Sequence, residues 1–464
     1  MRTPPAAALA ALRESLSGPL HARGDDGYLS EIEGFNSAAP MAPDYVVGAA
    51  TERDVQLAVR FAADNGMTVA VQATGHGSYA PVPDGVLIRT HRLDRVAVDL
   101  GARAATIGAG APWRAVLSRL VGTGLTAITG AAPGVGVVGF TLGGGIGPLS
   151  RTLGFAADRV RRFRVVTGEG LVVEADGERN PDLFRALKGG KIGLGVVVET
   201  TIDLIDLPTV YAGGLFWAEE HIEAVLRAWV DWTAAVPDTI NSSVNIVRFP
   251  AVEEVPVPLR GRTILHLRFA YVDRDATPEV RRRRAEELLA PLRAVAPVHL
   301  DTIGELPTTE VGTIHADPEG PLPIWERGLL LDPLDQDFVT ALLPHVGAGV
   351  DAPYAAVEIR QLGGALTREP PAPSAIGGRG AAYSLFLVGV PDVGLFTDVL
   401  PRRTELVEDA IAPFVHAETN YNWAGHPTPE DFARLWPAET AAYLDDVRRR
   451  HDPAGVFAAG RRPR

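Results

Sequence analysis

The sequence predicts an α+β protein with two domains and a C-terminal segment that follows them. Three observations predict this class. At 464 residues the chain is too long for one simple core. Its first 206 residues alternate short, turn-bounded strands and helices without the regular order of βαβ units. Residues 209–405 instead combine longer apolar strands with amphipathic helices, which is the pattern of an antiparallel sheet backed by helices.

The first region is expected to contain short elements in irregular order. A helix is predicted over 51–65, because Thr51 is a suitable N-cap and Glu52 and Asp54 fall in the first turn. The other predicted elements are helices over 113–121 and 181–187 and strands over 67–71, 85–89, 96–99, 104–107, 163–166, 171–174 and 195–205.

The middle region and the tail complete the predicted organisation. The middle elements are strands over 264–272, 355–361 and 383–388 and helices over 221–234 and 279–294. A single helix is predicted over 428–449 in the tail. We therefore divide the chain into residues 1–206, 207–405 and 406–464.

Composition excludes several classes of function. The net charge of −13 argues against a nucleic-acid partner, which needs a basic face. The absence of cysteine excludes disulfides, thiolate metal sites and a cysteine nucleophile. No run reaches the roughly 18 apolar residues of a membrane span, and the N-terminus is typical of an amphipathic helix. We expect a cytoplasmic protein with no membrane partner and no metal site, present as a monomer or homodimer.

A histidine in a turn of small residues is the strongest candidate site. The turn is Ala73-Thr74-Gly75-His76-Gly77-Ser78, and a glycine-dense segment follows over 130–147. Glycine costs conformational entropy, so such a run is expected where the backbone approaches a ligand or adopts unusual dihedral angles. Together the two features predict a large, flat cofactor with phosphates. Taken alone, Gly-His-Gly is more typical of a surface loop.

The glycine segment contains a literal match to the dinucleotide fingerprint over 134–139. That fingerprint requires a helix to begin inside the motif. Residues 140–148 contain too many glycines to continue as a stable helix. We therefore reject a nicotinamide site and expect an extended, glycine-lined wall for an aromatic ring system and a pyrophosphate. A second glycine cluster over 188–198 is placed to face the same ligand.

Several further motifs accompany the histidine turn along the chain. They are Ala132 to Gly139, Gly143 to Gly147, Asn180 to Gly190, Asn420-Tyr421-Asn422, and His451 to Phe457. In this order the chain resembles the FAD-linked oxidases of the berberine bridge enzyme-like family, within the vanillyl-alcohol-oxidase type of flavoprotein fold. The resemblance implies a PCMH-type FAD-binding domain over 1–206, a substrate-binding domain over 207–405, and a segment over 406–464 that returns to the FAD domain.

The resemblance also implies a cofactor site. FAD would be bonded covalently to His76, and only there, because Ala132 stands where many relatives carry a second, cysteinyl link. The other residues that the resemblance places at FAD are Gln72, Ala73, Thr74, Gly75, Gly77, Ser78, Ala132, Val135, Gly136, Gly139, Thr141, Gly144, Gly147, Gly195, Val197 and Asn422.

The catalytic base is the least determined part of the site. The candidates are Tyr421, Glu358 and Gln361, while Asn420 replaces the tyrosine that relatives often use. In the strand-like stretch over 355–361, Glu358 and Arg360 are expected on one face and Gln361 on the other. For Glu358 the alternative is an ion pair with Arg360, and for Tyr421 a core tyrosine.

The expected function is oxidation of a bulky small molecule in bacterial natural-product metabolism, with O₂ as electron acceptor. The reaction would be alcohol oxidation or dehydrogenation coupled to cyclisation. Three alternatives stay open: oxygenation or a redox-neutral rearrangement on the same flavin, oxidation of a sugar, and a flavoprotein-like binding scaffold without redox activity.

Overall fold

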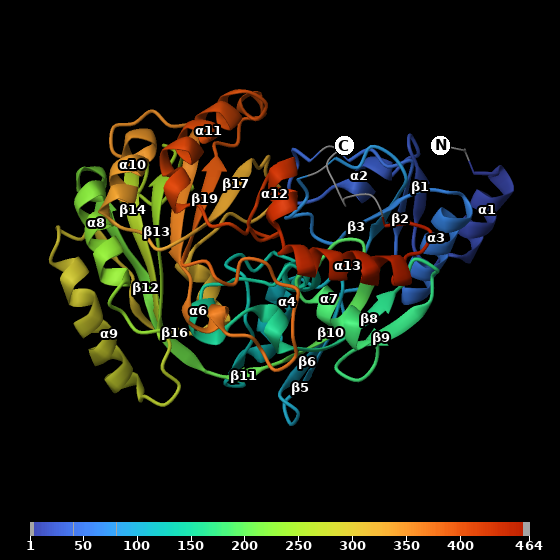
Figure 1. The fold of residues 1–464 in the computed structure, drawn as a ribbon, viewed down its shortest axis with the longest axis horizontal. Coiled ribbons are helices and arrows are strands. Elements are labelled where there is room, and N and C mark those ends of the chain that lie inside the picture. Colours follow the sequence, from blue (N-terminus) through green and yellow to red (C-terminus); the bar gives the residue numbers. More distant parts are fainter. Residues whose placement is uncertain (1–3, 40, 80, 458–464) are drawn as a thin grey trace.

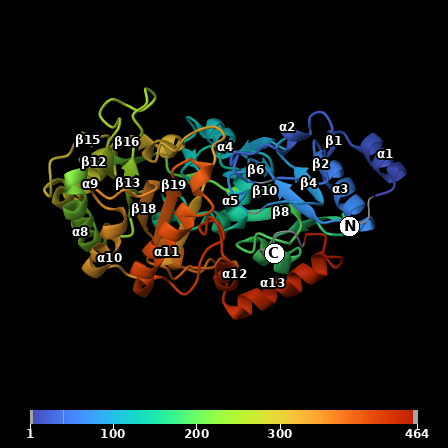
Figure 2. The same ribbon diagram turned by 90° about the horizontal axis from the view of Figure 1, so that it is seen from above.

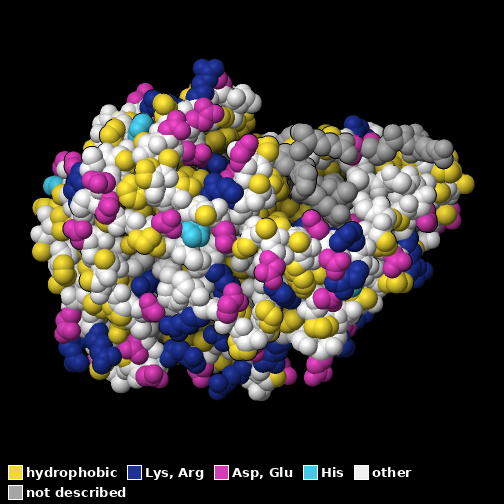
Figure 3. Space-filling model, viewed as in Figure 1, with side chains coloured by type: hydrophobic (Ala, Val, Ile, Leu, Met, Phe, Trp, Pro, Cys, Tyr) yellow, Lys and Arg dark blue, Asp and Glu magenta, His cyan; other side chains and the backbone are white. Residues whose placement is uncertain are grey.

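The computed structural model describes residues 4–39, 41–79 and 81–457. Two bodies lie side by side along the long axis of the molecule (Figure 1). The N-terminal body contains the smaller sheets, and the other body is built on one large sheet. Acidic and basic side chains are interspersed over the face of both bodies shown in Figure 3.

The N-terminal body contains a four-stranded sheet and a five-stranded sheet. The first is mixed, since β4 runs parallel to both neighbours while β1 is antiparallel to β2. The second is antiparallel throughout. In spatial order the strands are β1 (Leu20–Ala22), β2 (Tyr45–Gly48), β4 (Val86–Arg89) and β3 (Val69–Gln72), then β5 (Val96–Asp99), β6 (Ala104–Gly108), β10 (Val196–Asp203), β8 (Val160–Val166) and β9 (Val172–Ala175). A short pair, β7 (Leu125–Thr126) with β11 (Ile205–Asp206), stands apart.

The helices of this body follow from local sequence signals. Thr51 caps α3, as predicted: its hydroxyl accepts from the Asp54 amide in a capping box. The helices are α1 (Ala6–Ser15), α2 (Tyr28–Ile32), α3 (Glu52–Asp64), α4 (Trp113–Leu120), α5 (Val137–Leu142), α6 (Ser150–Leu153) and α7 (Pro181–Leu187).

The second body is an eight-stranded antiparallel sheet covered on one face by helices, as the sequence predicts (Figures 1 and 2). The strands in spatial order are β15 (Leu300–Asp301), β12 (Thr209–Ala218), β14 (Thr263–Tyr271), β13 (Ile240–Arg248), β18 (Tyr354–Gln361), β19 (Tyr383–Gly389) and β17 (Glu326–Leu331), with β16 (Gly304–Pro307) also paired to β12. The covering helices are α8 (Ile222–Thr233), α9 (Pro278–Arg293), α10 (Gln336–Val346) and α11 (Val399–Ile411).

Alternation along the central strands gives this sheet two different faces. Apolar side chains such as Val244, Leu267 and Ile359 pack under the helices in the largest core of the molecule. The opposite face carries buried polar groups, which are Ser243, Asn245, His266, Arg268, Glu358 and Arg360. The prediction that Glu358 and Arg360 share a face, with Gln361 on the other, is confirmed.

The polar face of the large sheet lies against the N-terminal body. Ala212 and Ala270 pack with Leu149 and Leu153 from that body. Arg151 of α6 reaches between two strands, where its guanidinium donates to the carbonyls of Leu362, Pro237 and Ile240. The face that carries the polar groups is therefore closed by the body that contains the histidine turn.

The C-terminal segment returns to the N-terminal body, as Figure 2 shows for α13. Leu444 and Val447 pack in the same core as residues of α7 and the five-stranded sheet. The prediction of one helix over 428–449 is wrong. Two helices form instead, α12 (Pro429–Arg434) and α13 (Ala438–His451), because Pro437 cannot continue a helix and serves as the N-cap of the second one.

Candidate flavin site and active site

His76 lies in a tight turn directly after β3. Gly75 has a φ of +82°, and an added Cβ there would lie 2.8 Å from the Gly34 Cα, so this position requires glycine. The His76 ring stacks on Phe35 with 3.7 Å between ring centroids, and its Nδ1 lies 2.9 Å from the Thr74 hydroxyl. Burial lowers the pKa of His76 to about 4, and the Arg114 charge acts in the same direction. The imidazole is therefore neutral at pH 7.

Buried hydrogen bonds hold the backbone of this turn. Gln72 accepts from the Arg89 guanidinium at 2.7 Å and donates to the Ser78 hydroxyl at 3.0 Å. Arg89 also donates to the Ala73 carbonyl. In this structure Gln72, Ala73 and Ser78 position the turn around His76.

The glycine segment lies directly against the histidine turn. The Gly136 amide donates to the Thr74 hydroxyl at 3.3 Å. An added Cβ at Gly134 would lie 3.4 Å from the His76 Cε1. The expectation of an extended wall is wrong for part of this segment, because α5 begins at Val137 and ends before Gly143. Its six residues contain a single glycine, which a short helix supported by the core tolerates.

The turn after α7 and the C-terminal segment complete this region. The Lys191 ammonium donates to the Asn422 side-chain oxygen at 2.6 Å and lies 4.8 Å from the centre of the Tyr421 ring. Asn422 in turn donates to the Phe140 carbonyl at 2.7 Å. Burial lowers the pKa of Lys191 to about 8. Four segments that are far apart in sequence thus meet around His76 and α5.

Several of the proposed cofactor glycines have packing reasons of their own. At Gly195 an added Cβ would meet the Val165 side chain and the Val166 carbonyl. At Gly144 it would meet Phe155 and Ile376, and at Gly147 it would meet the Thr129 carbonyl. By contrast, Gly77 and Gly139 are exposed, and an added Cβ would meet no atom closer than 3.9 Å. Ala132, Val135 and Gly136 belong to the glycine segment beside the histidine turn, and Val197 is buried in β10.

These residues fit FAD. A neutral imidazole retains a nitrogen lone pair that can bond to a flavin methyl carbon. Gly77 and Gly139 leave open space beside the backbone, where an isoalloxazine or pyrophosphate can approach. The Thr141 hydroxyl in α5 is buried without a hydrogen-bond partner among the described residues. The residues that would hold FAD are therefore in place around His76, α5 and the Lys191 turn.

The three candidate bases, and Asn420 in the position of the relatives' tyrosine, differ in their surroundings. Glu358 is held by Arg360 at 2.9 Å and Arg268 at 3.2 Å, and these two cations keep its pKa well below the usual range despite burial. Gln361 donates to the Thr233 carbonyl on the helix-covered face. Asn420 accepts from the Asn422 amide and donates to the Gly377 carbonyl. All three have structural partners in this state.

Tyr421 lies beside Lys191 and packs against Phe432. Burial raises its pKa to about 12, so the phenol is protonated at neutral pH. Within the ranges that the structure describes, its hydroxyl has no hydrogen-bond partner. Tyr421 as the catalytic base stays a prediction.

Sequence reasoning missed a second carboxylate on the polar face of the large sheet. Glu326, the first residue of β17, accepts a hydrogen bond from the Tyr79 hydroxyl, only three residues beyond His76. No lysine or arginine of the described chain forms an ion pair with it. Burial raises the pKa of Glu326 to about 7, and Asp317 acts in the same direction. No short motif marks this pair, since 247 positions separate the two residues.

The described chain contains neither a metal cluster nor a membrane-spanning helix. No cluster of three or more His, Cys, Asp or Glu side chains could hold a metal ion there. Likewise, none of the described helices is long and apolar enough to cross a membrane.

Comparison with known proteins identifies the domain around His76. Residues 43–176 match a family model described as an FAD binding domain. The chain carries an FAD-binding domain. It is 29% identical over 268 residues to (R)-6-hydroxynicotine oxidase of Paenarthrobacter nicotinovorans, covering 55% of this chain and 57% of that protein. It is 30% identical over 234 residues to an uncharacterized FAD-linked oxidoreductase of Arthroderma benhamiae, covering 47% of each. The chain therefore spans about half the length of the curated relatives it matches.

A likeness over the whole chain exists at the level of structure. The berberine bridge enzyme-like protein 1 of Physcomitrella patens superimposes with a TM-score of 0.80 at 19% identity, covering 97% of each chain. This likeness shows the fold. The predictions of a PCMH-type FAD-binding domain and of the α+β berberine bridge enzyme-like fold are confirmed.

Proposed function

We propose that this chain is an FAD-linked oxidase of a small organic substrate. The main support is that three features lie together within and beside the FAD-binding domain. They are neutral His76, the glycine segment over 134–143 and the Lys191–Asn422 pair. FAD held by these residues would supply two-electron redox chemistry, in which the substrate is oxidised and O₂, with two protons, is reduced to H₂O₂.

The link to FAD would be a single bond from His76. The chain contains no cysteine, and Ala132 has no nucleophilic atom. Because burial and Arg114 keep the imidazole uncharged, it can act as a nucleophile at neutral pH. The Thr74 hydroxyl and the Phe35 ring hold the imidazole in one orientation.

Glu326 is the best placed proton acceptor. As an alcohol becomes a carbonyl compound, its C–H bond breaks with the electron pair and its O–H proton must go to a base. Glu326 is a half-buried carboxylate with no cation partner among the described residues, so its surroundings favour the protonated form. Tyr79 donates to one carboxylate oxygen and fixes the side chain. Glu358 is a poor base by comparison, because two arginines stabilise its charge.

For the substrate, we propose a bulky intermediate of bacterial natural-product metabolism, which the protein would oxidise. The named relatives support a range of uses of the same domain, since they include both the hydroxynicotine oxidase and FAD-dependent monooxygenases of fungi. The oxygenase alternative is therefore retained as the second candidate. It differs from an oxidase by incorporating an oxygen atom from O₂ into the product.

A visible spectrum before and after acid precipitation tests the cofactor assignment. Flavin absorbance should stay with the precipitated protein, and His76→Ala should release it to the supernatant. His91→Ala is a matched control, because His91 lies outside the turn, and it should leave the flavin in the precipitate. A colourless protein that cannot be reconstituted with FAD would overturn the proposal in favour of a binding scaffold.

Oxygen consumption with H₂O₂ detection then separates the uses of the flavin. A panel of sugars and of polycyclic aromatic alcohols should give one equivalent of H₂O₂ for each substrate oxidised. Label from ¹⁸O₂ in the organic product would instead support the oxygenase.

A further inference from the structure

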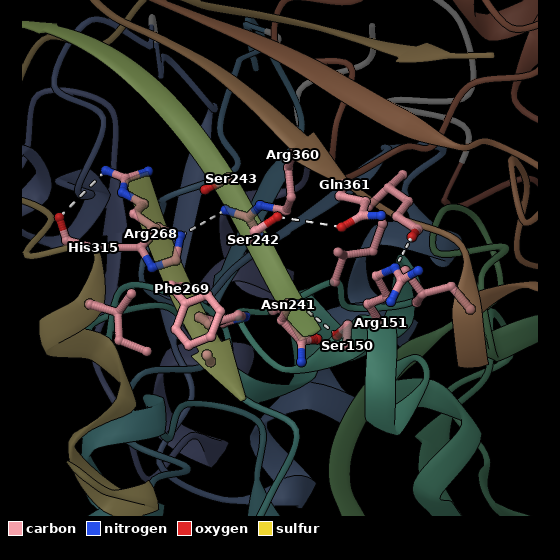
Figure 4. Close-up of a pocket in the computed structure, with 17 residues that line it drawn as sticks. Ser150, Arg151, Asn241, Ser242, Ser243, Arg268, Phe269, His315, Arg360 and Gln361 are labelled. Carbon is pink, nitrogen blue, oxygen red and sulfur yellow. Dashed lines mark hydrogen bonds between the residues drawn. The ribbon is translucent and has the colours of Figure 1, made fainter. Parts of the chain in front are cut away.

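A pocket with unused hydrogen-bond donors lies on the polar face of the large sheet (Figure 4). It forms where β13 and β18 separate beyond the Ser243–Arg360 pair. Ile146, Gly147 and Pro148 of the FAD-binding domain form its opposite wall. The described residues that line it include Arg151, Arg268, Arg360 and His315 but no aspartate or glutamate.

Some polar groups of this pocket are already satisfied. Arg151 donates to three backbone carbonyls and pairs with Asp238. The Asn241 amide exchanges hydrogen bonds with Thr152. These two side chains join the two bodies, and the bonds that they donate there hold them in place.

Two buried donors are left without an acceptor. The Arg268 Nε–H has no partner among the described residues. Arg360 donates through Nη2 to the His315 Nε2 at 2.9 Å, and an arginine can only donate, so that nitrogen must be the acceptor. His315 is neutral, since burial lowers its pKa to about 4, and its one proton is therefore on Nδ1. That Nδ1–H is also buried and unpaired within the described chain.

The cluster around Arg268 and Arg360 carries an excess of positive charge, which favours the same kind of ligand as its unpaired N–H donors do. Among the described residues, Glu358 is the one carboxylate that contacts both arginines, at 3.2 Å from Arg268 and 2.9 Å from Arg360. Asp317 is the next carboxylate, exposed and 4.0 Å from Arg268. One buried negative charge thus faces two buried positive charges. A buried excess charge and buried unpaired donors are both costly, and an anionic acceptor would relieve both.

We infer that the substrate carries a carboxylate, which binds at Arg268, Arg360 and the His315 Nδ1–H. The inference rests on the proposed function and names the substrate class of the same site. The pocket adjoins the flavin region, because Arg360 stacks over Trp423, the residue that follows Asn422, at 5.0 Å. A carboxylate held here would anchor the substrate while its reacting carbon points toward the FAD-binding domain.

Calorimetric titration of the purified holoprotein with benzoate and with benzamide tests the inference. The two probes have nearly the same shape and differ in charge. Benzoate should bind at least tenfold more tightly. Arg268→Gln and Arg360→Gln should each weaken benzoate binding at least tenfold and leave benzamide binding nearly unchanged. Arg248→Gln is the matched control, since Arg248 is on β13 but donates to the Val346 carbonyl near the helices, and it should keep the preference.

Removal of the opposing charge provides a second test that a merely structural role would not pass. Glu358→Gln should bind benzoate more tightly than the unmodified protein, although it should melt earlier. Equal affinity for benzoate and benzamide would overturn the inference. So would binding of inorganic phosphate with no binding of benzoate, because the pocket would then serve a free anion. These binding results do not depend on turnover, so they fail separately from the flavin spectrum that tests the proposed function.

Discussion

Two carboxylates stand on the same face of the large sheet, Glu358 buried and Glu326 half-buried, and their surroundings are opposite. Glu358, on the central strand β18, is bound by two arginines, and its pKa is held well below the usual range. Glu326, at the start of β17, has the Tyr79 hydroxyl as its partner, and its pKa is raised to about 7. The comparison teaches that burial alone does not make a base. A carboxylate with nearby cations stays charged and organises its neighbours, whereas one without them can exchange a proton near neutral pH.

Loss of the carboxylate at Glu326 should have the largest effect. Glu326→Gln keeps the size and the contact with Tyr79 but cannot accept a proton. We expect kcat to fall by roughly 10²- to 10⁴-fold, the usual contribution of a general base. Steady-state oxygen consumption measures this, with the flavin spectrum as a check on loading. A variant that retains full kcat would remove Glu326 from the reaction.

Loss of the carboxylate at Glu358 should act on stability. Glu358→Ala leaves two buried guanidinium groups without their shared counter-ion, which typically costs about 3–5 kcal/mol. Thermal or denaturant unfolding of the flavin-loaded protein measures the loss. Glu408→Ala, which removes a half-buried partner of Arg327, should cost less because Asp431 still pairs with that arginine. Equal losses in the two variants would contradict the comparison.

The two carboxylates should also give stability opposite dependences on pH. Glu326 has a raised pKa, so its contribution is fully present below the pKa of the unfolded chain and is lost as pH rises through about 7. Glu358 has a lowered pKa, so its contribution is present at neutral pH and is lost only in acid. Glu326→Gln should therefore melt a few degrees higher than the unmodified protein at pH 8, and the gain should be much smaller at pH 5, which is close to the unfolded pKa of 4.5. A gain that is equal at both pH values would indicate a packing effect instead.

The sequence was a good guide wherever a local pattern decides the structure. The Thr51 cap, the turn at Gly75 and the alternation of Glu358 and Gln361 depend on neighbouring residues, and each forms as predicted. The continuous tail helix failed at Pro437. The extended glycine wall failed at α5, where packing in the core outweighs low helix propensity.

The surroundings of the two carboxylates could not be read from the sequence in the same way. Arg360 is two positions from Glu358, so an ion pair was foreseeable. Arg268 reaches Glu358 only because β14 and β18 flank β13. Tyr79 and Glu326 are joined by the docking of the two bodies, which no periodicity encodes. Glu326 was missed because its raised pKa reflects burial without a nearby cation, and the sequence does not show which cations lie near it in the folded chain.

The smallest expected effect is a shift in the pH profile. The hydrogen bond from Tyr79 stabilises the ionised carboxylate and so lowers the pKa of Glu326, in opposition to burial. Tyr79→Phe should therefore move the midpoint of the rise in kcat with pH above its position near 7, with a moderate loss of the plateau rate. Tyr443→Phe is the matched control, since its hydroxyl donates to the Asp182 carbonyl in the N-terminal body, and it should leave the midpoint in place. A midpoint that responds to Tyr421→Phe and not to Tyr79→Phe would transfer the role of base to Tyr421, because the group that sets the profile would then lie beside Lys191 and not beside Glu326.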